Sequence, residues 1–258
     1  MQLHQGSQPL VISFPHSGRA LPADIAARMT EAGRAVTDTD WHVEQLYAFA
    51  KAMGVSWIEP TYSRYVVDLN RPPDDAALYA GQVSTGLCPT HTFAGDALYV
   101  GATPDATEVA LRRAQYWQPY HDGLQDLLAK AQARHGFAVL LDAHSIRSVV
   151  PRLFDGRLPD INVGTYGGLS CDPMLEAQVM AVLAQNPLFT HVLNGRFQGG
   201  YITRHYGNPH ARVYALQIEL SQLAYMDEAT VAFDEYRATP LMDLLKQVVA
   251  ELLQFCPA

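Results

Sequence analysis

The stretch FAVLLDAHS runs from Phe137 to Ser145 and begins with five consecutive apolar residues. Such a run is typical of a strand buried on both faces, and Asp142 and His144 follow at its carboxyl end. A strand of this kind needs helices on both sides of its sheet, which is the arrangement of largely parallel α/β sheets. Because ligands of such proteins bind beyond the carboxyl ends of the strands, the segment also predicts where a site would lie.

The rest of the chain alternates between strand-like and helix-like patterns. Further strands are predicted at Leu10–Phe14, Val55–Glu59, Tyr65–Leu69, His191–Asn194 and Val213–Leu220. Helices are predicted over Pro22–Met53 with a break near Gly33, over Asp105–Arg134 with a kink or division at Pro119, and over Asp172–Gln185 and Ala238–Phe255. Residues 72–104 are rich in glycine, proline and aspartate and are expected to form a long, partly ordered excursion. We therefore expect one α/β domain over residues 1–258, a three-layer sandwich with a mixed, largely parallel sheet between helices.

The composition is that of a globular chain with an acidic charge balance. Of the 258 residues, 48% are hydrophobic and 17% are charged, which provides enough apolar material for a core. The net charge of -8 argues against nucleic acid or an anionic membrane as a partner, because both are bound by basic surfaces. The amino-terminal stretch lacks the pattern of a signal peptide, no run approaches 18 apolar residues, and the three cysteines form no CxxC pair. We expect a cytoplasmic monomer that acts on a small molecule.

Polar side chains follow four of the predicted strands. His16 comes after the run LVISF, the pair Asn70-Arg71 after YVVDL, His144 after FAVLL, and Glu219 lies near the end of YALQIEL. One such residue would be explained by the surface or by a satisfied core position. Four at the same kind of position indicate a site, because burying polar groups without a partner costs free energy.

His16 and His144 are the natural candidates for metal ligands. A catalytic zinc site uses three protein ligands and one open position, and imidazole with carboxylate suits zinc better than calcium or magnesium. The third ligand is expected from the segment DTDWHVE, which offers Asp40, His42 and Glu44. On a helix Asp40 and Glu44 would share a face while His42 points away, and we rank Asp40 first.

Two further carboxylates fit the same site. Asp142 lies two residues before His144, so in an extended chain it faces the same side and could orient the histidine; a strand-end cap is the alternative. Glu219 lies inside the apolar run LQIEL, where a carboxylate next to a metal would act as general base and then general acid. The alternative for Glu219 is a buried salt bridge to a nearby arginine.

The chain offers positive charge for an acidic ligand through four arginines, namely Arg64, Arg71, Arg196 and Arg204. Guanidinium groups bind carboxylates through two parallel hydrogen bonds. Arg71 follows Asn70 at a predicted strand end, and Arg204 lies in GGYITRHYG, where Tyr201 and His205 flank it. Asn70, Arg71, Arg204, Tyr201 and His205 are therefore the candidate substrate contacts.

The chain resembles the N-formylglutamate amidohydrolase (deformylase) family over nearly its whole length. The stretches that carry the resemblance are SFPHSG, DTDWHVEQLY, YVVDLNRP, GLCPTHTF, LLDAHSIRS, LPDINVGT, GGYITRHYG and LQIELSQLAYMDE. More distantly it is similar to the aspartoacylase and succinylglutamate desuccinylase group and to the zinc carboxypeptidases. The resemblance to that group implies a mixed eight-stranded sheet between helices, zinc held by two histidines and a glutamate, a DLNR segment that binds substrate, and a glutamate base.

These roles carry over onto His16, His144, Asn70, Arg71 and Glu219. One position departs from the distant group, because the residue three places after the first histidine is Arg19 instead of a glutamate. The carboxylate ligand must then come from elsewhere, which favours Asp40.

The resemblance implies hydrolysis of N-formyl-L-glutamate to formate and L-glutamate, a late step of histidine breakdown. Arg64, close before the DLNR segment, is expected to stabilise the oxyanion. The alternatives are another N-acyl amino acid hydrolase, a small carboxypeptidase, or a protein that binds an acidic metabolite without a metal.

Overall fold

A seven-stranded sheet forms the centre of the computed structural model, which describes residues 1–76 and 85–257. Its strand order is β1-β3-β2-β4-β7-β5-β6. The strands are β1 (Gln2–His4), β2 (Leu10–Ser13), β3 (Ser56–Glu59), β4 (Ala138–Ile146), β5 (Ile161–Gly164), β6 (His191–Leu193) and β7 (Val213–Ser221). Four neighbouring pairs are parallel, and the pairs β1–β3 and β5–β7 are antiparallel. The sheet is thus mixed and mostly parallel, as predicted.

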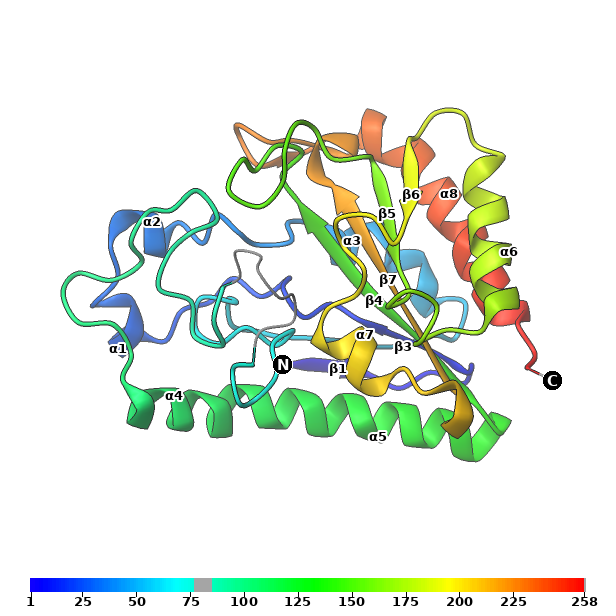
Figure 1. The fold of residues 1–258 in the computed structure, drawn as a ribbon, viewed down its shortest axis with the longest axis horizontal. Helices are drawn as coiled ribbons and strands as arrows, with labels where there is room; N and C mark the ends of the chain where they lie inside the picture. The colour runs from blue at the N-terminus through cyan, green and yellow to red at the C-terminus, as the bar shows by residue number, and fades with distance from the viewer. Residues whose placement is uncertain (77–84, 258) are drawn as a thin grey trace.

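Helices cover both faces of the sheet. Figure 1 shows the long helix α5 (Gln118–His135) along one face and α6 (Pro173–Ala184) with α8 (Glu235–Gln254) on the other. The shorter elements are α7 (Tyr201–Tyr206), the 3-10 turns η3 (Pro209–Ala211) and η4 (Gln222–Ala224), and a hairpin of β8 (Met226–Asp227) and β9 (Ala232–Phe233). The three-layer α/β fold predicted from the sequence is confirmed. No helix in residues 1–76 and 85–257 combines the length and the apolar character needed to cross a membrane.

Two apolar cores lie on the two faces of the sheet. Along β4, Ala138 and Leu140 pack toward α5, while Leu141 and Ala143 pack toward α6 and α8. This alternation follows from the pleat of a strand, in which successive side chains point to opposite faces. Each face of the strand is apolar, which explains the uninterrupted hydrophobic run in the sequence.

The pairing of β4 with β7 places polar residues at one end of the α5 face. Lower on this face Leu140 is opposite Ala215, and both are buried in the core under α5. Further along, Asp142 is opposite Gln217, and His144 is opposite Glu219. The same face therefore changes from apolar to polar toward the carboxyl ends of the strands.

The stretch Tyr65–Leu69 is not a strand, contrary to the prediction, and its backbone consists of turns and irregular structure. Two of its carbonyl groups accept hydrogen bonds from side chains of α4 (Ala106–Arg112) and α5 instead of from a neighbouring strand. Arg112 Nη1 donates to Val66 O at 3.0 Å, and His121 Nε2 donates to Leu69 O at 2.9 Å. The apolar pattern that suggested a strand comes from burial of this loop against the core of α5.

The predicted helix over Pro22–Met53 is also wrong as a continuous element. The structure has four separate short pieces there, α1 (Ala23–Ala26), α2 (Glu31–Arg34), α3 (Val43–Leu46) and the 3-10 turn η1 (Ala48–Lys51). Val36 and His42 have positive φ values of 43° and 60°, a backbone conformation that interrupts a helix. Because α3 begins only at Val43, Asp40 and Glu44 do not share a helical face as expected.

The other predicted elements agree with the structure to within a few residues, except that β4 continues to Ile146. The helix near Pro119 is divided, as expected, into α4 (Ala106–Arg112), a π-helical turn η2 (Arg113–Trp117) and α5. Strands β1 and β5 were missed because neither contains an uninterrupted apolar run: their sequences are QLH and INVG. The described sheet has seven strands where the distant resemblance implied eight. Within the predicted excursion 72–104, residues 77–84 lie outside the described part, and the described remainder contains no helix or strand.

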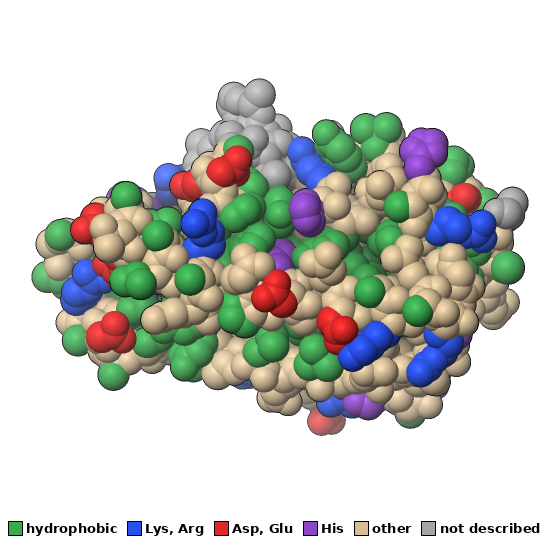
Figure 2. Space-filling model, turned by 90° about the horizontal axis from the view of Figure 1, so that it is seen from below, with side chains coloured by type: hydrophobic (Ala, Val, Ile, Leu, Met, Phe, Trp, Pro, Cys, Tyr) green, Lys and Arg blue, Asp and Glu red, His purple; other side chains and the backbone are tan. Residues whose placement is uncertain are grey.

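The molecular surface mixes charges of both signs. Figure 2 shows acidic and basic side chains scattered among apolar ones over the described part of one face, without a single large patch of either colour. The positive charge that an acidic ligand requires must therefore be supplied locally, by individual arginines inside a site.

Candidate active site

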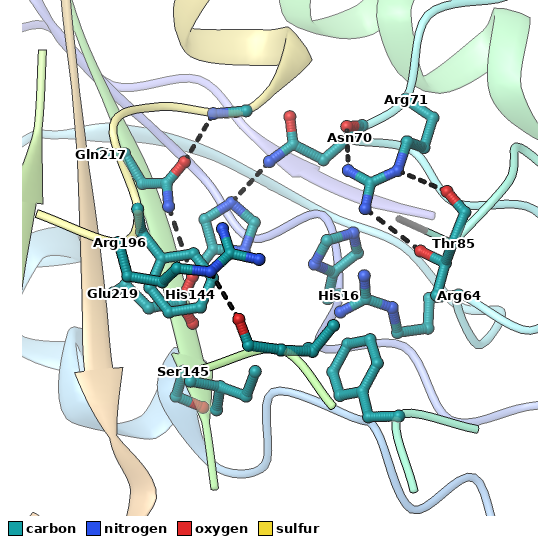
Figure 3. A pocket seen from close by; sticks show the side chains of 15 residues that line it. His16, Arg64, Asn70, Arg71, Thr85, His144, Ser145, Arg196, Gln217 and Glu219 are labelled. Atoms are coloured by element: carbon teal, nitrogen blue, oxygen red, sulfur yellow. Dashed lines mark hydrogen bonds between the residues drawn. The ribbon is translucent and has the colours of Figure 1, made fainter. Parts of the chain in front are cut away.

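A cavity opens at the carboxyl ends of β4 and β7, the edge of the sheet that the sequence predicts. Figure 3 shows how side chains from several elements meet around it. It is lined by His16, Arg64, Asn70, Arg71, Thr85, Phe93, His144, Ser145, Ile146, Leu153, Arg196, Phe197, Gly200, Gln217 and Glu219. Seven of the candidate residues from the sequence are thus brought to one place, six of them in the lining and Asp40 just behind His16 and His144.

His16, Asp40 and His144 bring three possible metal-binding atoms together. These atoms lie within 4.8 Å of one another, and all three residues are buried. Asp40 Oδ2 is 2.9 Å from His144 Nδ1 and 3.7 Å from His16 Nδ1. Tetrahedral zinc with bonds of about 2.1 Å would place its ligand atoms roughly 3.4 Å apart, so the observed spacing fits such an ion.

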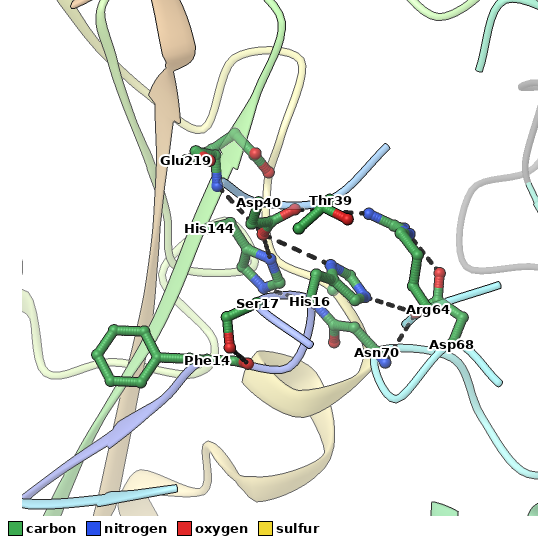
Figure 4. A network of polar contacts seen from close by, with 12 residues as sticks. Phe14, His16, Ser17, Thr39, Asp40, Arg64, Asp68, Asn70, His144 and Glu219 are labelled. Atoms are coloured by element: carbon green, nitrogen blue, oxygen red, sulfur yellow. Dashed lines mark hydrogen bonds and ion pairs between the residues drawn. The ribbon is translucent and has the colours of Figure 1, made fainter. Parts of the chain in front are cut away.

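A second carboxylate lies behind each histidine. Asp68 Oδ1 is 2.7 Å from His16 Nε2 (Figure 4). Asp142 Oδ2 is 3.0 Å from His144 Nε2. At His16 the Asp68 carboxylate accepts the Nε2 proton, which leaves Nδ1 directed at Asp40, an arrangement common to histidine ligands of metals. At His144, Nε2 is also 2.9 Å from Asn70 Nδ2, and Nδ1 is directed at Asp40. Asp142 therefore lies where the sequence predicted, whereas Asp68 was not singled out.

The charges of this cluster are strongly coupled to one another. Burial alone would raise the pKa of Asp40, but the neighbouring His16 and the hydrogen bond from His144 lower it instead. Burial alone would lower the pKa of His144, but Asp142 and then Asp40 raise it. The cluster thus holds Asp40 as a carboxylate, the form in which it could bind a cation.

The backbone around Asp40 fixes its side chain in the cluster. The Asp40 amide donates to His16 O at 3.0 Å, and the Ser145 amide donates to Asp40 Oδ2 at 3.1 Å. The other two candidates for a third ligand lie elsewhere. His42 Nε2 donates to the carbonyl of Val231 at 2.9 Å, and Glu44 forms an ion pair with Arg19 at 2.7 Å.

Glu219 is buried with 7% of its surface exposed, and its pKa is raised to about 8, chiefly because of burial. Gln217, two residues earlier on the same face of β7, donates from Nε2 to Glu219 Oε2 at 3.3 Å. The Gly200 amide in turn donates to Gln217 Oε1 at 2.8 Å. The sequence analysis did not single out Gln217, although the two-residue spacing that identified Asp142 beside His144 applies equally to it.

Arg64 is held firmly beside the cluster. Its Nη2 donates to Asp68 Oδ2 at 2.7 Å, and its Nη1 lies 3.7 Å from Asp40 Oδ1. The guanidinium also lies over the ring of Phe93 at 4.8 Å. Arg64 forms no salt bridge with Glu219, the alternative considered for this glutamate, because its ion pairs are with Asp68 and Asp40.

Arg71 lies at another side of the cavity. Its Nε donates to Thr85 O at 2.9 Å and its Nη2 to Thr85 Oγ1 at 3.1 Å. The adjacent Asn70 donates from Nδ2 to Asp142 Oδ2 at 3.1 Å and accepts from the Ile202 amide at 2.8 Å. Asn70 therefore ties the DLNR segment to β4 and to α7.

Arg204, Tyr201 and His205 were expected to contact substrate, but the described lining of the cavity includes none of them. Arg204 Nε donates to Gly199 O at 2.8 Å, and its guanidinium lies over the Tyr166 ring. Tyr201 and His205 stack on each other, one turn apart on α7. Of the segment GGYITRHYG, it is the second glycine, Gly200, that lines the cavity.

Gly200 allows α7 to approach the DLNR segment. A Cβ added to Gly200 would lie 2.3 Å from Asn70 Nδ2, so a larger residue would displace this side chain. The direction of the helical side chains away from the cavity could not be deduced from the sequence, because it depends on where α7 meets Asn70.

Comparison with known proteins shows the family of the chain. A family model described as N-formylglutamate amidohydrolase matches residues 8–226. The chain is 50% identical to an N-formylglutamate deformylase of Pseudomonas aeruginosa over 255 residues, covering 98% of this chain and 94% of that protein. It is 46% identical to an N-formylglutamate deformylase of Pseudomonas putida, again over 98% of this chain and 95% of that protein.

Two solved structures share the fold. The crystal structure of an N-formylglutamate amidohydrolase from Ralstonia eutropha matches with a TM-score of 0.83 and 28% identity, covering 96% of this chain and 95% of that one. A protein from Agrobacterium tumefaciens matches with a TM-score of 0.72 and 18% identity, covering 97% of this chain and 95% of that one, a likeness of fold alone. The extent of the family match, together with relatives of about half identical sequence over almost the whole chain, leads to one conclusion: the chain belongs to the N-formylglutamate amidohydrolase family.

Proposed function

We propose that the protein hydrolyses N-formyl-L-glutamate to formate and L-glutamate with the help of one bound zinc ion. The observation that carries this proposal is that buried Glu219 and the His16–Asp40–His144 cluster share one cavity with several arginines. The names of the relatives support the substrate, because those proteins are 46% and 50% identical over 98% of this chain.

The metal would be held by His16 Nδ1, Asp40 and His144 Nδ1. Support comes from the spacing of these atoms and from the carboxylates of Asp68 and Asp142 behind the two rings. A bound zinc ion supplies Lewis acidity, which polarises a carbonyl oxygen and makes a nearby water more acidic.

Glu219 is the general base of the proposed reaction. Its carboxylate accepts a proton from water while the water oxygen forms a bond to the formyl carbon. It then donates this proton to the amide nitrogen as the carbon–nitrogen bond breaks, which releases formate and the free amine of glutamate. A buried carboxyl with a raised pKa can hold the proton between the two steps.

Arg64 is assigned to the oxygen that becomes negative when water adds to the formyl carbon. Its fixed contact with Asp68 means that it needs little reorganisation during the reaction. Arg71, on another side of the cavity, is assigned to a substrate carboxylate. We place this activity at a late step of histidine breakdown, in line with the family.

The experiment is an assay of formate release from N-formylglutamate, N-acetylglutamate and N-formylglutamine with the purified protein. The protein is tested as isolated, after chelation, and after zinc is restored, with bound metal measured in each sample. We expect turnover of N-formylglutamate that is lost on chelation and regained with zinc. N-acetylglutamate should be slower by roughly 10-fold or more, because an extra methyl in a tight site is discriminated to about that degree.

Two results would contradict the proposal. Full activity in a chelated sample free of metal would exclude the zinc-dependent mechanism. Equal turnover of all three amides would indicate a general N-acyl hydrolase, and binding of acidic amides without turnover would indicate a metabolite-binding protein.

A further inference from the structure

Two arginines between β6 and the end of α7 are held in closely similar ways. Arg196 donates from Nε to Leu153 O at 2.6 Å, and its guanidinium lies over the Phe197 ring at 5.3 Å. Arg204 donates from Nε to Gly199 O at 2.8 Å, and its guanidinium lies over the Tyr166 ring at 4.4 Å. A backbone carbonyl and an aromatic ring are thus among the partners of each side chain.

The two arginines differ in where they lie. Arg196 lines the cavity, and Figure 3 shows its guanidinium extending into it in front of His144. Arg204 is not among the described residues of the lining. Of these two arginines, Arg196 is therefore the one placed to contact a ligand in this cavity, although both belong to the same segment of sequence.

The wall next to Arg196 is apolar. Ile146, Leu153 and Phe197 line the cavity and belong to one buried cluster that also includes Val150 and Leu158. This cluster fixes Phe197, on which the Arg196 guanidinium lies. An apolar wall that ends at a guanidinium suits a short aliphatic chain with a terminal carboxylate.

The surroundings of Arg71 and Arg64 are different. Arg71 lies in a polar corner beside Thr85, and in Figure 3 it is on the opposite side of the cavity from Arg196. Arg64 is engaged by Asp68 at 2.7 Å and is near Asp40 at 3.7 Å. A ligand with two carboxylates thus meets one guanidinium on each side of the cavity.

We propose that Arg196 is the residue that recognises the side-chain carboxylate of the substrate, with the methylene groups packed on Ile146, Leu153 and Phe197. This inference rests on the proposed function and adds its specificity determinant. Arg71 then binds the carboxylate attached to the α-carbon, which stands next to the scissile amide. The substrate class is an N-formyl amino acid with an acidic side chain, and the preference for a charged side chain depends on a single guanidinium.

The test compares Arg196→Ala with the matched variant Arg204→Ala. Both are assayed on N-formylglutamate and on N-formylglutamine, which differ only in the charge of the side-chain group. In the wild type we expect N-formylglutamate to be preferred by about 30-fold or more in kcat/KM, as is common for a buried charge-assisted contact. Arg196→Ala should lose this factor for N-formylglutamate, change less than about 3-fold on N-formylglutamine, and so lose the preference. Arg204→Ala should retain it.

Arg196→Gln, which keeps most of the side-chain length without the charge, guards against a folding defect in the alanine variant. Inhibition by L-glutamate, measured against inhibition by L-glutamine, gives a second readout that depends on binding alone. We expect both Arg196 variants to bind the two amino acids with similar strength. Thermal unfolding of each variant shows whether it is folded.

The outcomes separate this inference from the proposed function. If the wild type does not hydrolyse N-formylglutamate, both are overturned. If it does, and both Arg196 variants still prefer the charged substrate, the assignment of Arg196 is wrong while the activity stands. Loss of the preference in Arg204→Ala alone would return the role to Arg204.

Discussion

Glu219 is the residue on which the proposed chemistry depends. Replacing it by glutamine keeps its shape but removes its capacity to accept a proton. For Glu219→Gln we expect kcat to fall by at least about 100-fold, while KM and the content of bound zinc change little. Steady-state kinetics and metal analysis of the purified variant check this.

The matched control is Glu176→Gln. Glu176 is a partly buried carboxylate on α6 that accepts a hydrogen bond from Thr165, and it does not line the cavity. This control should keep its activity. Turnover of Glu219→Gln within a few-fold of the wild type would mean that Glu219 is structural and that another group is the base.

Individual site residues could be predicted to different degrees. His16, His144 and Glu219 could be found because each is a polar residue at the end of a buried apolar run. The helical face expected to hold Asp40 and Glu44 is absent, since α3 begins at Val43, but Asp40 does lie beside His16 and His144. The sequence does not show that Arg196 lines the cavity while Arg204 does not, because the direction of each side chain depends on the local backbone and on how α7 is placed.

At the scale of elements, residues 66–73 form no strand, and side chains of the helical region from α4 to α5 donate hydrogen bonds to their carbonyl groups. Four carbonyls between Val66 and Pro73 accept hydrogen bonds from its side chains. The donors are Arg112 to Val66 O, His121 to Leu69 O, Trp117 to Arg71 O at 3.0 Å, and Arg113 to Pro73 O at 3.2 Å. The π-helical turn at 113–117 carries two of these donors and sets their directions.

Trp117→Phe tests this support. Phenylalanine retains an aromatic ring but has no N–H, so the carbonyl of Arg71 loses its partner and the arginine becomes less well positioned. We expect KM for N-formylglutamate to rise about 5- to 10-fold, the equivalent of about one hydrogen bond, with kcat within about 3-fold. Steady-state kinetics of the variant and the wild type give both constants.

Trp57→Phe is the control, because Trp57 is also buried but lies on β3 in the core of the opposite face. An equal rise of KM in this control would attribute the effect to general loss of packing. A fall in kcat without a change in KM would place the role of Trp117 elsewhere.

The apolar runs that form the centre of the sheet were predicted well, whereas the apolar run at 65–69 was wrongly predicted as a strand. Apolar runs at 10–14, 137–141 and 213–220 are strands because each lies inside the sheet. The run at 65–69 is also mostly apolar, but it has no neighbouring strand in the described part of the chain, and two of its carbonyl groups accept hydrogen bonds from helical side chains. Hydrophobic periodicity predicts which residues are buried. It does not predict which groups form hydrogen bonds with their backbone N–H and C=O groups.

For the whole molecule, His121 makes stability depend on pH. It is a buried residue of α5, and both of its ring nitrogens are engaged, Nε2 by Leu69 O and Nδ1 by the Tyr206 hydroxyl at 3.0 Å. Burial lowers its pKa from 6.5 to about 4. Between these values the unfolded chain binds a proton that the folded protein does not, so stability falls as the pH is lowered through this range.

From pH 7 to pH 4.5 this group should remove about 2 kcal/mol from the free energy of unfolding. Other groups titrate in the same range. The contribution of His121 is therefore the change in the free energy of unfolding of the wild type between the two pH values, minus the same change in His121→Gln. Urea unfolding at the two pH values measures it, and His91→Gln, at an exposed histidine, serves as the control. The same pH dependence in all three proteins would show that His121 titrates normally in the folded state.

The pairing of β4 with β7 has a consequence for anyone who wishes to re-engineer this enzyme. His144 and Glu219 stand directly opposite each other on neighbouring strands. Their separation is therefore set by the regular spacing of the sheet. Neighbouring strands lie about 4.8 Å apart, and successive residues on one face of a strand lie about 6.6 Å apart. Moving the glutamate by one residue would turn it to the opposite face of the sheet. The distance between the proposed metal ligand His144 and the proposed base Glu219 can change only in coarse steps, so a site for a bulkier acyl group has to be made by reshaping the loops.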